Sequence, residues 1–537
     1  MKKRRSWWRR LPLGLQLLAV GYIACLAWVF TYGTPVLPQK KITLRIAHWQ
    51  IEKGPPDGID EVIKRYEKLH PEVKVEQVLV PGGIYRLWLR TMLSGGEAPD
   101  IVEFGAWLEN VTDIPLRYFE PLTEPLLEPN PYNQGTPLEG VTWLKTFEDE
   151  LLEQRSNSPE PGQYYSVTMS RGSWRMFANT DLLKEITGSD QVPTRFDDFL
   201  KLCAQVKAYG QAHGKSIMPL AGAKDNATFF AFLYMQGLMA KYTFTMDRDG
   251  VLAVDNRQLS SAYLEGRWRW QQPELQASLT ILGQLFAQMK PGFLQLTRDD
   301  AVQEFMRGDA LFVFTGTFDG TTLRRLAPFH VEAYRLPQPT KDDPVIGKYL
   351  AGHFVDGDNT TGFSLYLNKA TKHPKEAVDF LRFLTSYESG RSFMAKSGWI
   401  TALRKVPIPP EIVSDLSPAD GIVAGACYCN AGSEATRLFW NEVYRMTRPH
   451  GSVEDLTKAL DEKMPKAMRM DLETEEHNQR LTLAPRDVGI AAVGALAREK
   501  ADDAALRLRR ERLESAQNQS EGLTLYLGQQ LRSVPRP

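Results

Sequence analysis

The sequence predicts an α/β protein with two lobes and a helical carboxyl-terminal part, and three observations lead to this prediction. Strand-like and helical patterns alternate on short loops along most of the 537 residues, as they do in parallel, doubly wound sheets. An irregular stretch over 115–165, rich in Pro, Asn and Glu, interrupts the alternation. Beyond residue 431 only helical patterns remain. At about 100–200 residues per domain, the chain can build two or three domains with sizeable cores.

The composition excludes several classes of protein. Lys and Arg number 65, as do Asp and Glu, so the formal net charge is zero. Nucleic-acid binding depends on an excess of positive charge, and we therefore expect no nucleic-acid partner. The 40 Gly and 34 Pro form no repeated tract, which is typical of a globular protein. Four Cys over the whole length are too few for disulfides to hold the fold together.

The amino terminus predicts a membrane segment. The first ten residues carry six cationic side chains and no anionic one, and residues 11–30 carry no formal charge. At ~1.5 Å per residue this run spans about 30 Å, the thickness of the hydrocarbon core of a bilayer. We expect residues 1–33 to be a basic cytoplasmic tip and an uncleaved transmembrane signal anchor, followed by a linker over 34–41. A secretory signal cleaved after Gly33 and a lipoprotein signal at Cys25 are the alternatives. All three place the folded body on the periplasmic, extracytoplasmic face of the membrane.

The elements of the first α/β run follow from apolar spacing and turn residues. Alternating apolar residues predict an opening strand that ends at Trp49. Apolar residues three and four positions apart then predict two helices, the first ending before Pro71 and the second closed by Gly95 and Gly96. The expected strands are 42–48, 73–80 and 101–104, and the expected helices are 59–69 and 85–93.

The second run repeats the alternation with longer helices. A strand-like segment over 166–178 opens it. Thr194 and Asp197 form a predicted capping box that starts a helix through residue 208. Thr297 caps another helix, over 297–306, which Gly308 ends. Further helices are expected over 228–241, 275–289 and 374–385, a polar hairpin near 247–250, and buried strands over 310–314 and 362–367.

Residues 471–537 are predicted to form a charged, helical carboxyl-terminal extension. Within it, residues 498–516 are dense in charges of both signs and hold only three large apolar residues, all Leu. This pattern favours a solvated surface helix, because an apolar seam over three or four heptads is absent. A partner-binding or coiled-coil helix is the alternative.

Six segments carry a resemblance to a known family. They are ITLRIAHW, GIDEVIKRYEKLHPEVKVE, LSGGEAPDIVEF, RMFANTDLLKE with VPTRFDDFLKLCAQV, AVQEFMRGDALFVFTGTFD, and KATKHPKEAVDFLRFLTSYESGRSFMAKSGWITA. In this order, over residues 42–470, the chain resembles the extracellular solute-binding proteins of ABC transporters, in the large sugar-binding family that includes maltodextrin-binding proteins. The stretch 115–165 and the residues after 470 fall outside this resemblance.

The resemblance implies a two-lobed clam-shell of the periplasmic-binding-protein type, whose interleaved lobes close about a hinge. The chain would cross between lobes near 166–178 and 310–320, with the ligand held between the lobes at the carboxyl ends of the strands. The implied function is capture of a mono- or oligosaccharide for uptake by a monomer that uses no cofactor, catalyses no reaction and meets the permease subunits of an ABC transporter. A membrane-tethered ligand sensor or scaffold is the alternative, and a periplasmic glycan-active enzyme is a third.

Candidate ligand-binding residues lie at predicted strand ends and turns. An aromatic ring can pack on the apolar C–H face of a sugar, and carboxylates and amides can pair with its hydroxyls. The expected residues are Trp49, Glu103, Phe104, Trp174, Asp225, Asn226, Phe318, Asp319 and Trp399. The resemblance places the last three in pocket turns of the family. The alternatives are core packing for Trp49 and Trp174, and helix capping for Asp225 and Asn226. Trp268 and Trp270 either line the cleft, form a surface patch or pack against a helix.

Other chemistry has little support in the sequence. Cys427 and Cys429 have no nearby His and offer too few ligands for a closed zinc site, so we expect no metal. In an oxidising compartment Cys203 could pair with either of them. Glu103 and Asp319 could be drawn as a glycosidase pair, but sugar-binding carboxylates have the same appearance in a sequence. The sequence contains neither a glycine-rich phosphate loop followed by Lys-Ser/Thr nor a nucleophile elbow.

Overall fold

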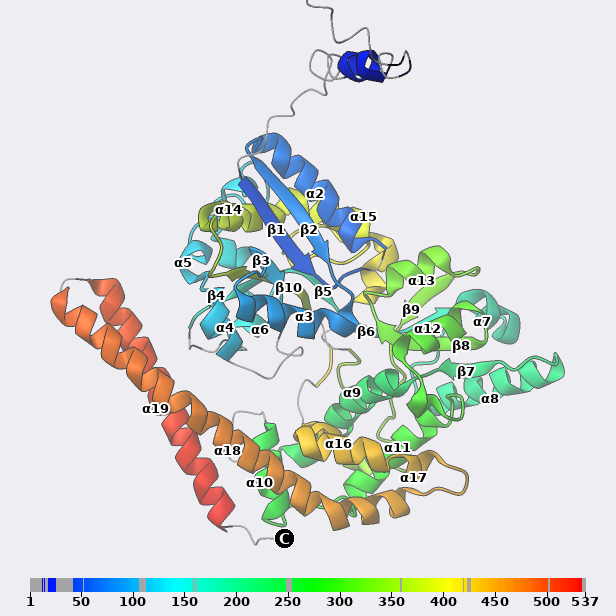
Figure 1. The fold of residues 1–537 in the computed structure, drawn as a ribbon. Helices are drawn as coiled ribbons and strands as arrows, with labels where there is room; N and C mark the ends of the chain where they lie inside the picture. The colour runs from blue at the N-terminus through cyan, green and yellow to red at the C-terminus, as the bar shows by residue number, and fades with distance from the viewer. Residues whose placement is uncertain are drawn as a thin grey trace, which may run out of the picture.

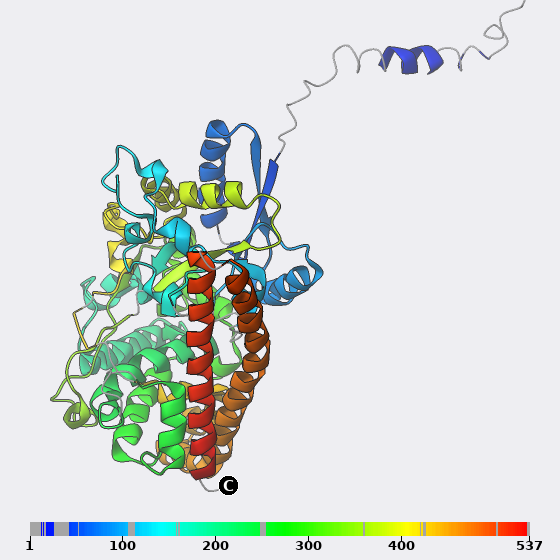
Figure 2. The same cartoon turned by 90° about the vertical axis from the view of Figure 1, so that its left-hand side faces the viewer.

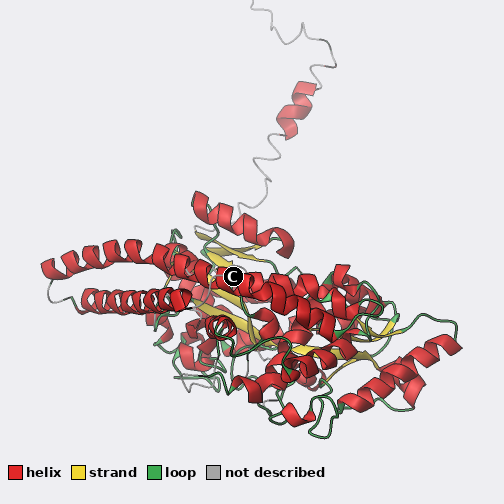
Figure 3. Cartoon of the chain, turned by 90° about the horizontal axis from the view of Figure 1, so that it is seen from below, coloured by secondary structure: helices red, strands yellow, loops and turns green. Residues whose placement is uncertain are grey.

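The computed structural model describes most of the chain beyond the amino terminus (Figure 1). It describes residues 12, 14, 18–25, 42–51, 53–105, 113–156, 158, 160, 162–247, 254–357, 360–418, 420–422, 426–500 and 503–533. Helices surround the strands (Figure 3). They form two sheets, and we call the six-stranded sheet with its helices the first lobe and the four-stranded sheet with its helices the second lobe.

The first lobe has a mixed sheet in the order β2-β1-β3-β10-β4, with β5 also paired to β10. Its strands are β1 (Ile42–His48), β2 (Val73–Leu79), β3 (Ile101–Glu103), β4 (Phe119–Glu120), β5 (Ser166–Gly172) and β10 (Thr360–Asn368). β1 pairs in parallel with β2 and β3, whereas β10 is antiparallel to β3, β4 and β5. Ile46 faces both Gln77 and Ile101, so the carboxyl ends of β1, β2 and β3 meet at one edge.

Local sequence explains the helices of the first lobe. They are α2 (Pro55–Leu69), α3 (Gly82–Gly95), α14 (Pro374–Leu384) and α15 (Tyr387–Ser397). α2 buries Ile59, Val62 and Tyr66 on one face, and α14 and α15 pack beside it. α3 ends at Gly96, whose φ of 72° suits a residue without a Cβ atom. Both amino-terminal helices and all three strands of the first run occur where the sequence predicts them.

The irregular stretch after β3 also belongs to the first lobe. Its elements are α4 (Asp113–Tyr118), β4, α5 (Thr123–Leu126), η2 (Pro131–Asn133), η3 (Trp143–Thr146) and α6 (Leu152–Ser156). Trp143 anchors it: the indole has no exposed surface, and its Nε1–H donates to Oγ1 of Thr385 at 2.8 Å. Tertiary contacts of this kind hold the stretch where helical and strand periodicity are both missing.

The second lobe has a sheet in the order β7-β8-β6-β9. Its strands are β6 (Trp174–Asn179), β7 (Met218–Ala221), β8 (Ala310–Gly316) and β9 (Val331–Tyr334). β8 is buried at every position and pairs in parallel with β7 and antiparallel with β6. The helices around this sheet are α7 (Thr180–Thr187), α8 (Phe196–Ala212), α9 (Lys224–Thr243), α10 (Asn256–Leu264), α11 (Pro273–Phe286), α12 (Arg298–Met306), α13 (Gly320–Leu326), α16 (Ser433–Glu442) and α17 (Tyr444–Thr447).

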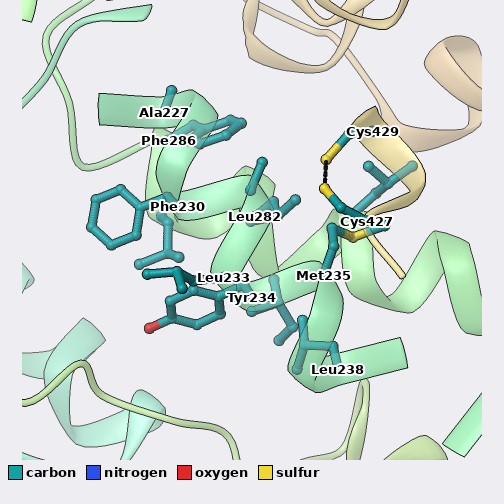
Figure 4. Close-up of a cluster of buried hydrophobic side chains, with 14 of the residues drawn as sticks. Ala227, Phe230, Leu233, Tyr234, Met235, Leu238, Leu282, Phe286, Cys427 and Cys429 are labelled. Atoms are coloured by element: carbon teal, nitrogen blue, oxygen red, sulfur yellow. Dashed lines mark hydrogen bonds between the residues drawn. The ribbon is translucent and has the colours of Figure 1, made fainter. Parts of the chain in front are cut away.

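α9 runs through the core of the second lobe. Buried side chains occur around the helix rather than along one stripe, which is typical of a helix enclosed by others. Figure 4 shows Leu282 and Phe286 of α11 among the side chains packed with it. Trp268 and Trp270 belong to the same core and have no exposed surface, and Trp270 stacks on Phe439 of α16. The packing alternative therefore holds for these two tryptophans.

The chain passes between the lobes at Ser173, the one residue between β5 and β6, and again between β9 and β10. Thr317, just after β8, binds the first crossing: its N–H donates to the Ser173 carbonyl at 2.8 Å, and its hydroxyl accepts from the Ser173 N–H at 3.0 Å. β8 itself remains within the second sheet. The segment 310–320 therefore touches a crossing instead of forming one, because β8 is paired on both edges inside the second lobe.

α18 (Val453–Glu499) and α19 (Ala504–Ser533) form a helical hairpin that extends along one side of the molecule (Figures 1 and 2). Early in α18, Leu456, Leu460 and Met464 have no exposed surface and belong to the core of the second lobe. Further along, the guanidinium of Arg486 donates to the Ala516 carbonyl at 2.8 Å and joins the two helices. Residue 471, the predicted start of the extension, lies inside α18, so the hairpin grows directly out of the second lobe.

Two predicted helix details are wrong. α8 begins at Phe196 with Arg195 as its N-cap and without a side-chain cap, because the backbone on either side of Arg195 instead pairs with Gln338, whose N–H donates to the Thr194 carbonyl at 2.8 Å. The charged run 498–516 is also not one helix. α18 ends within it, and Asp503 starts α19 by accepting from the Leu506 N–H at 3.1 Å.

The amino-terminal predictions remain predictions. Residues 18–25 are helical, but most of 11–30 lies outside the described residues. Within the part that is described, no helix has the length and apolar character needed to cross a membrane. Most of the polar hairpin expected near 247–250 likewise lies outside the described residues.

Candidate ligand-binding site

Two aromatic rings meet where the chain enters the second lobe. Trp174 begins β6, directly after the crossing at Ser173, and Phe229 lies in the second turn of α9. Their rings stack with centroids 3.7 Å apart and planes 18° apart. Phe229 nevertheless keeps 38% of its surface exposed. We call this pair the ring platform, because it presents aromatic surface at the junction of the lobes.

Phe318 extends the ring platform from the turn after β8. Its ring meets Trp174 edge-on, with centroids 6.0 Å apart. The guanidinium of Arg298, the first residue of α12, lies 5.0 Å from the centroid of the Phe318 ring, within cation–π range. Gly316 permits this arrangement, since a Cβ atom at that position would overlap the Phe318 ring.

Two carboxylates lie next to Arg298. Asp225 is exposed and accepts a hydrogen bond from the Arg298 backbone N–H at 3.3 Å. Asp319 is buried and accepts from the Thr315 hydroxyl at 2.6 Å, and its carboxylate lies 3.8 Å from the Arg298 guanidinium. Hydrogen-bond acceptors with negative charge and a hydrogen-bond donor with positive charge therefore lie close to exposed aromatic surface.

Asn226 is a buried residue that supports the ring platform from within the fold. It has no exposed surface, and its Nδ2–H donates to the Phe314 carbonyl at 2.5 Å. This bond fixes the first turn of α9 to β8, and so helps to place Phe229 three residues later. Direct contact between Asn226 and a ligand stays a prediction.

Trp399 and Phe363 carry the aromatic contact into the first lobe. The indole N–H of Trp399 donates to the Phe318 carbonyl at 3.2 Å, and its ring lies 6.4 Å from that of Phe363. The Phe363 ring is in turn 5.1 Å from the imidazole of His48, the last residue of β1. A series of rings therefore runs from the end of β1 across the junction to the ring platform.

His48 is the titratable member of this series. It has no exposed surface, and its Nε2 lies 2.8 Å from Oε1 of Gln77. Burial lowers the pKa of His48 to about 4, against the opposing effect of the bond to Gln77. The imidazole is therefore neutral at pH 7.

The candidate Trp49, just after β1, is held by a buried carboxylate. Glu103 has no exposed surface and accepts from the Trp49 backbone N–H at 3.2 Å and from Nε2 of Gln50 at 2.5 Å. We call residues 49–51 the Trp49 loop. The Tyr85 ring meets the Trp49 ring edge-on at 5.0 Å, and burial is the main cause of the raised pKa of Tyr85. Glu103 therefore positions the Trp49 loop, and its contact with a ligand stays a prediction.

Phe104, the residue after Glu103, lies in the core of the first lobe. It is 4% exposed and packs against Phe119 and Tyr366, with ring centroids 5.5 and 5.3 Å away. Of the nine candidates, the structure thus gathers Trp174, Asp225, Phe318, Asp319 and Trp399 around the junction. The other four are Trp49, Glu103, Phe104 and Asn226, which lie in the Trp49 loop, beneath it, or in the core.

A buried ion-pair network lies at the residue after Trp174. Arg175 and Asp356 are 2% and 0% exposed, and Nη1 lies 3.2 Å from Oδ2. Burial lowers the pKa of Arg175, while Asp356 opposes this effect. Asp356 also accepts from the Leu336 N–H and the Ser417 hydroxyl, both at 2.9 Å. Because Leu336 and Asp356 lie on the connection between β9 and β10, the network ties this connection to β6.

Sequence reasoning does not identify Phe229 and Arg298. Apolar residues cover all faces of α9, so their spacing gives no sign of which Phe is exposed. Arg298 follows the Thr297 cap of α12 and looks like an ordinary surface cation. The capping box of α12 could have pointed to Arg298, because the box fixes where α12 starts and hence the direction of the Arg298 side chain.

One shallow depression lies outside this junction. It is lined by Arg195, Phe196, Asp197, Gln338, Pro339, Thr340 and Asp343, and it holds none of the nine candidates. Within the described ranges, no group of three or more His, Cys, Asp and Glu side chains could hold a metal ion.

Comparison with known proteins places the chain among binding proteins. Residues 52–391 match the family model described as bacterial extracellular solute-binding protein. An uncharacterized ABC transporter extracellular-binding protein of Pyrococcus horikoshii is 20% identical over 485 residues, which cover 85% of this chain and 97% of the relative.

Solved structures of such proteins share the fold. RafE from Streptococcus pneumoniae in its apo form has a TM-score of 0.53 at 17% identity and covers 80% of this chain and 99% of its own. The GacH receptor of Streptomyces glaucescens has a TM-score of 0.54 at 15% identity, with the same coverage. Maltose-bound T. maritima MalE3 has a TM-score of 0.52 at 17% identity and covers 79% of this chain and 99% of its own. At these identities the likeness concerns the fold alone.

Proposed function

The chain belongs to the bacterial extracellular solute-binding proteins, and we propose that it captures a carbohydrate between its lobes for uptake by an ABC transporter. In this proposal the protein binds and releases its ligand unchanged, without a cofactor. The predicted signal anchor would hold it at the extracytoplasmic face of the membrane, which would raise its effective concentration near the permease.

The ring platform is the observation that carries this proposal. A Phe that is more than one-third exposed while stacked on Trp174 gives a flat apolar surface of fixed orientation. The C–H face of a sugar ring has the matching shape and polarity, and its burial on such a surface is favourable. Because Phe229 and Trp174 are already stacked, little side-chain entropy is lost when a ligand binds.

The polar groups at Arg298 suit the hydroxyls of the same ligand. Asp225 is exposed and can accept hydrogen bonds from hydroxyl groups, and the guanidinium of Arg298 can donate them. Hydroxyls buried without partners would weaken binding by about 1–3 kcal/mol each. A saccharide is therefore a better match for this junction than a purely apolar ligand.

The ligands of structural neighbours support a sugar ligand. RafE has been solved with raffinose, GacH with acarbose and MalE3 with maltose. In our chain, the indole of Trp399 in the first lobe donates a hydrogen bond to the Phe318 carbonyl in the second. A ligand at the ring platform would therefore lie next to a contact between the lobes, which lobe movement would change. We propose that lobe closure around the sugar is the signal read by the permease.

A thermal-shift screen of the purified full-length chain against mono- and oligosaccharides tests the proposal. A bound sugar raises the melting temperature, because it binds the folded state alone. Phe229→Ala should weaken that response. Phe244→Ala is the matched control, since Phe244 caps the other end of α9 and is 39% exposed. Absence of a response to every sugar, or equal loss in both variants, would contradict a carbohydrate site at the ring platform.

The hairpin favours sensing as a second function. α18 and α19 lie outside the residues that match the family model. Arg509, near the hairpin turn, influences Lys369 of the first lobe: burial lowers the pKa of Lys369, and the nearby guanidinium adds to this effect. The hairpin, rooted in the second lobe, is thus placed to follow movement of the first. Sugar uptake by cells lacking the chain separates the two functions, because uptake fails if the chain serves transport and persists if it serves sensing.

A further inference from the structure

Two thiols meet in the core of the second lobe. Cys427 and Cys429 flank Tyr428 at η7 (Tyr428–Asn430), and their Sγ atoms lie 3.4 Å apart (Figure 4). The two residues are 8% and 3% exposed. We propose that Cys427 and Cys429 are joined by an intramolecular disulfide once the chain is outside the cytoplasm. This proposal rests on the extracytoplasmic location of the family and not on the identity of the ligand.

The backbone brings these two residues to the same side. The Asn430 N–H donates to the Cys427 carbonyl at 2.9 Å, which closes a turn over Tyr428 and Cys429. A disulfide has an S–S distance of about 2.0 Å, so the sulfur atoms must approach by about 1.4 Å. The proposal therefore requires the two side chains to rotate toward each other by this amount.

The surroundings favour this pair over other partners. Cys203, in α8, is buried in the same lobe, but among the three cysteines of that lobe, Cys427 and Cys429 are the two whose sulfur atoms touch. Within the described residues no third His, Cys, Asp or Glu completes a metal site with them. The pairings with Cys203 that the sequence leaves open are therefore disfavoured.

The core around the pair is apolar, which limits when oxidation can take place. Figure 4 shows Met235 of α9 next to Cys427. Hydrogen bonding to Cys427, together with burial, raises the pKa of the Cys429 thiol. Since the thiolate is the reactive form, the folded core protects the thiols from attack. The disulfide should therefore form during folding, before α9, η7 and α16 close around it.

The reaction balances with an external disulfide as the oxidant. While the chain is still folding, the thiolate of Cys427 attacks one sulfur of a protein disulfide in the extracytoplasmic compartment and expels the other sulfur as a thiolate. The Cys429 thiolate then attacks Sγ of Cys427 and displaces the second thiolate. The chain loses two protons and two electrons, and the oxidant gains the electrons to become a dithiol.

The bond would act locally. It closes a loop of only three residues, so it restricts the unfolded chain much less than a long-range disulfide would. Its main effects are to fix η7 between α9 and α16, and to remove two reactive thiols from a core. This agrees with a composition in which disulfides do not hold the overall fold.

Mass spectrometry of the full-length chain tests the proposal. The protein is taken from the membrane fraction, quenched in acid, denatured and alkylated before digestion. We expect the peptide that contains Cys427 and Cys429 to be two hydrogen atoms lighter than its dithiol form and to carry no alkyl group. After reduction it should take up two. Two alkyl groups without prior reduction, or a link from either residue to Cys203, would overturn the proposal.

Controls separate this result from the other proposals. Cys203→Ser should leave the mass of the Cys427 peptide unchanged, whereas in Cys427→Ser the thiol of Cys429 should become alkylated without reduction. Digestion of spheroplasts with an added protease checks the location, because the protease reaches only chains outside the cytoplasm. If the chain resists the protease and its thiols are free, the assumed extracytoplasmic location is wrong. Sugar-induced thermal shifts are recorded in parallel, and since they do not depend on the sulfur bond, either proposal can fail alone.

Discussion

The Trp49 loop of the first lobe and the ring platform of the second lobe fix their aromatic residues in opposite ways. Trp49 follows a strand, and a buried carboxylate, Glu103, holds its backbone N–H and the neighbouring Gln50 side chain. Trp174 begins a strand, and the ring of Phe229 holds it by stacking. An aromatic residue at the end of a strand therefore does not by itself indicate a ligand site. Polar bonds inside the first lobe hold the Trp49 loop, whereas Trp174 is stacked on a partly exposed ring at the junction, and we propose that this exposed ring surface marks the ligand site.

The largest expected effect concerns the charges next to the ring platform. Asp356→Ala leaves Arg175 buried without its partner, and loss of one member of a buried pair costs about 3–5 kcal/mol of unfolding free energy. Urea denaturation measures this loss. Asp420→Ala is the matched control, because Asp420 is an exposed partner of Arg335 and its removal should change stability little. Equal effects of the two substitutions would show that burial of the network contributes nothing.

A pH dependence should arise from the first lobe. Since the pKa of His48 is about 4 in the folded chain and about 6.5 when unfolded, the unfolded chain binds more protons between these values. The stability that depends on neutral His48 is complete above pH 6.5 and is lost as the pH falls toward 4, by about 3 kcal/mol. Denaturation at several pH values measures the slope, which His48→Gln should reduce. If the slope of unfolding free energy against pH is unchanged in the variant, other titratable groups cause it.

Ligand affinity should respond to the second lobe more than to the first. Phe229→Ala removes one ring of the stacked pair and should cost about 1–2 kcal/mol of binding free energy, or about 5–30-fold in Kd. Unfolding free energy should change less, because the ring is partly exposed. Titration calorimetry with the sugar identified in the screen gives Kd. If Trp49→Ala weakens binding more than Phe229→Ala does, the comparison between the two regions is reversed.

The smallest effect is expected from Glu103→Gln. The amide keeps the shape of the side chain but replaces one acceptor oxygen with a donor, and weakens the bonds to Trp49 and Gln50 by about 1 kcal/mol in total. If Glu103 only positions the Trp49 loop, stability falls slightly and Kd stays nearly constant. A loss of affinity much greater than the loss of stability would instead show that Glu103 touches the ligand.

Much of the fold can be predicted from the sequence because local patterns agree with tertiary packing. The apolar face of α2 and the Gly96 ending of α3 are visible in the sequence and occur as predicted. The start of α8 is different, because the backbone bond between Gln338 and Thr194 joins residues far apart in the chain. The length of α18 was also hidden: Pro465 and Pro485 lie inside it, although proline usually ends or bends a helix.

The candidate site divides in the same manner. Trp174 and Phe318 lie next to a predicted crossing and a predicted turn, so the sequence offers both as candidates. Phe229 has an equally apolar neighbour in Phe230, which stacks on Phe314 in the core. Only the packing of α9 against the sheet decides which of these two rings reaches the surface. Helix periodicity cannot distinguish them, because α9 carries apolar residues on all of its faces.

The hairpin has a consequence for how the protein behaves in solution. α18 has 47 residues, which at ~1.5 Å each make a rod of about 70 Å. A compact chain of 537 residues has a radius of gyration of about 24 Å, which corresponds to a sphere about 62 Å across. The hairpin is therefore about as long as the compact body that it lies against. We expect slightly more friction than for a sphere of equal mass and slightly earlier elution from a size-exclusion column, and light scattering separates this effect of shape from a true change in molar mass.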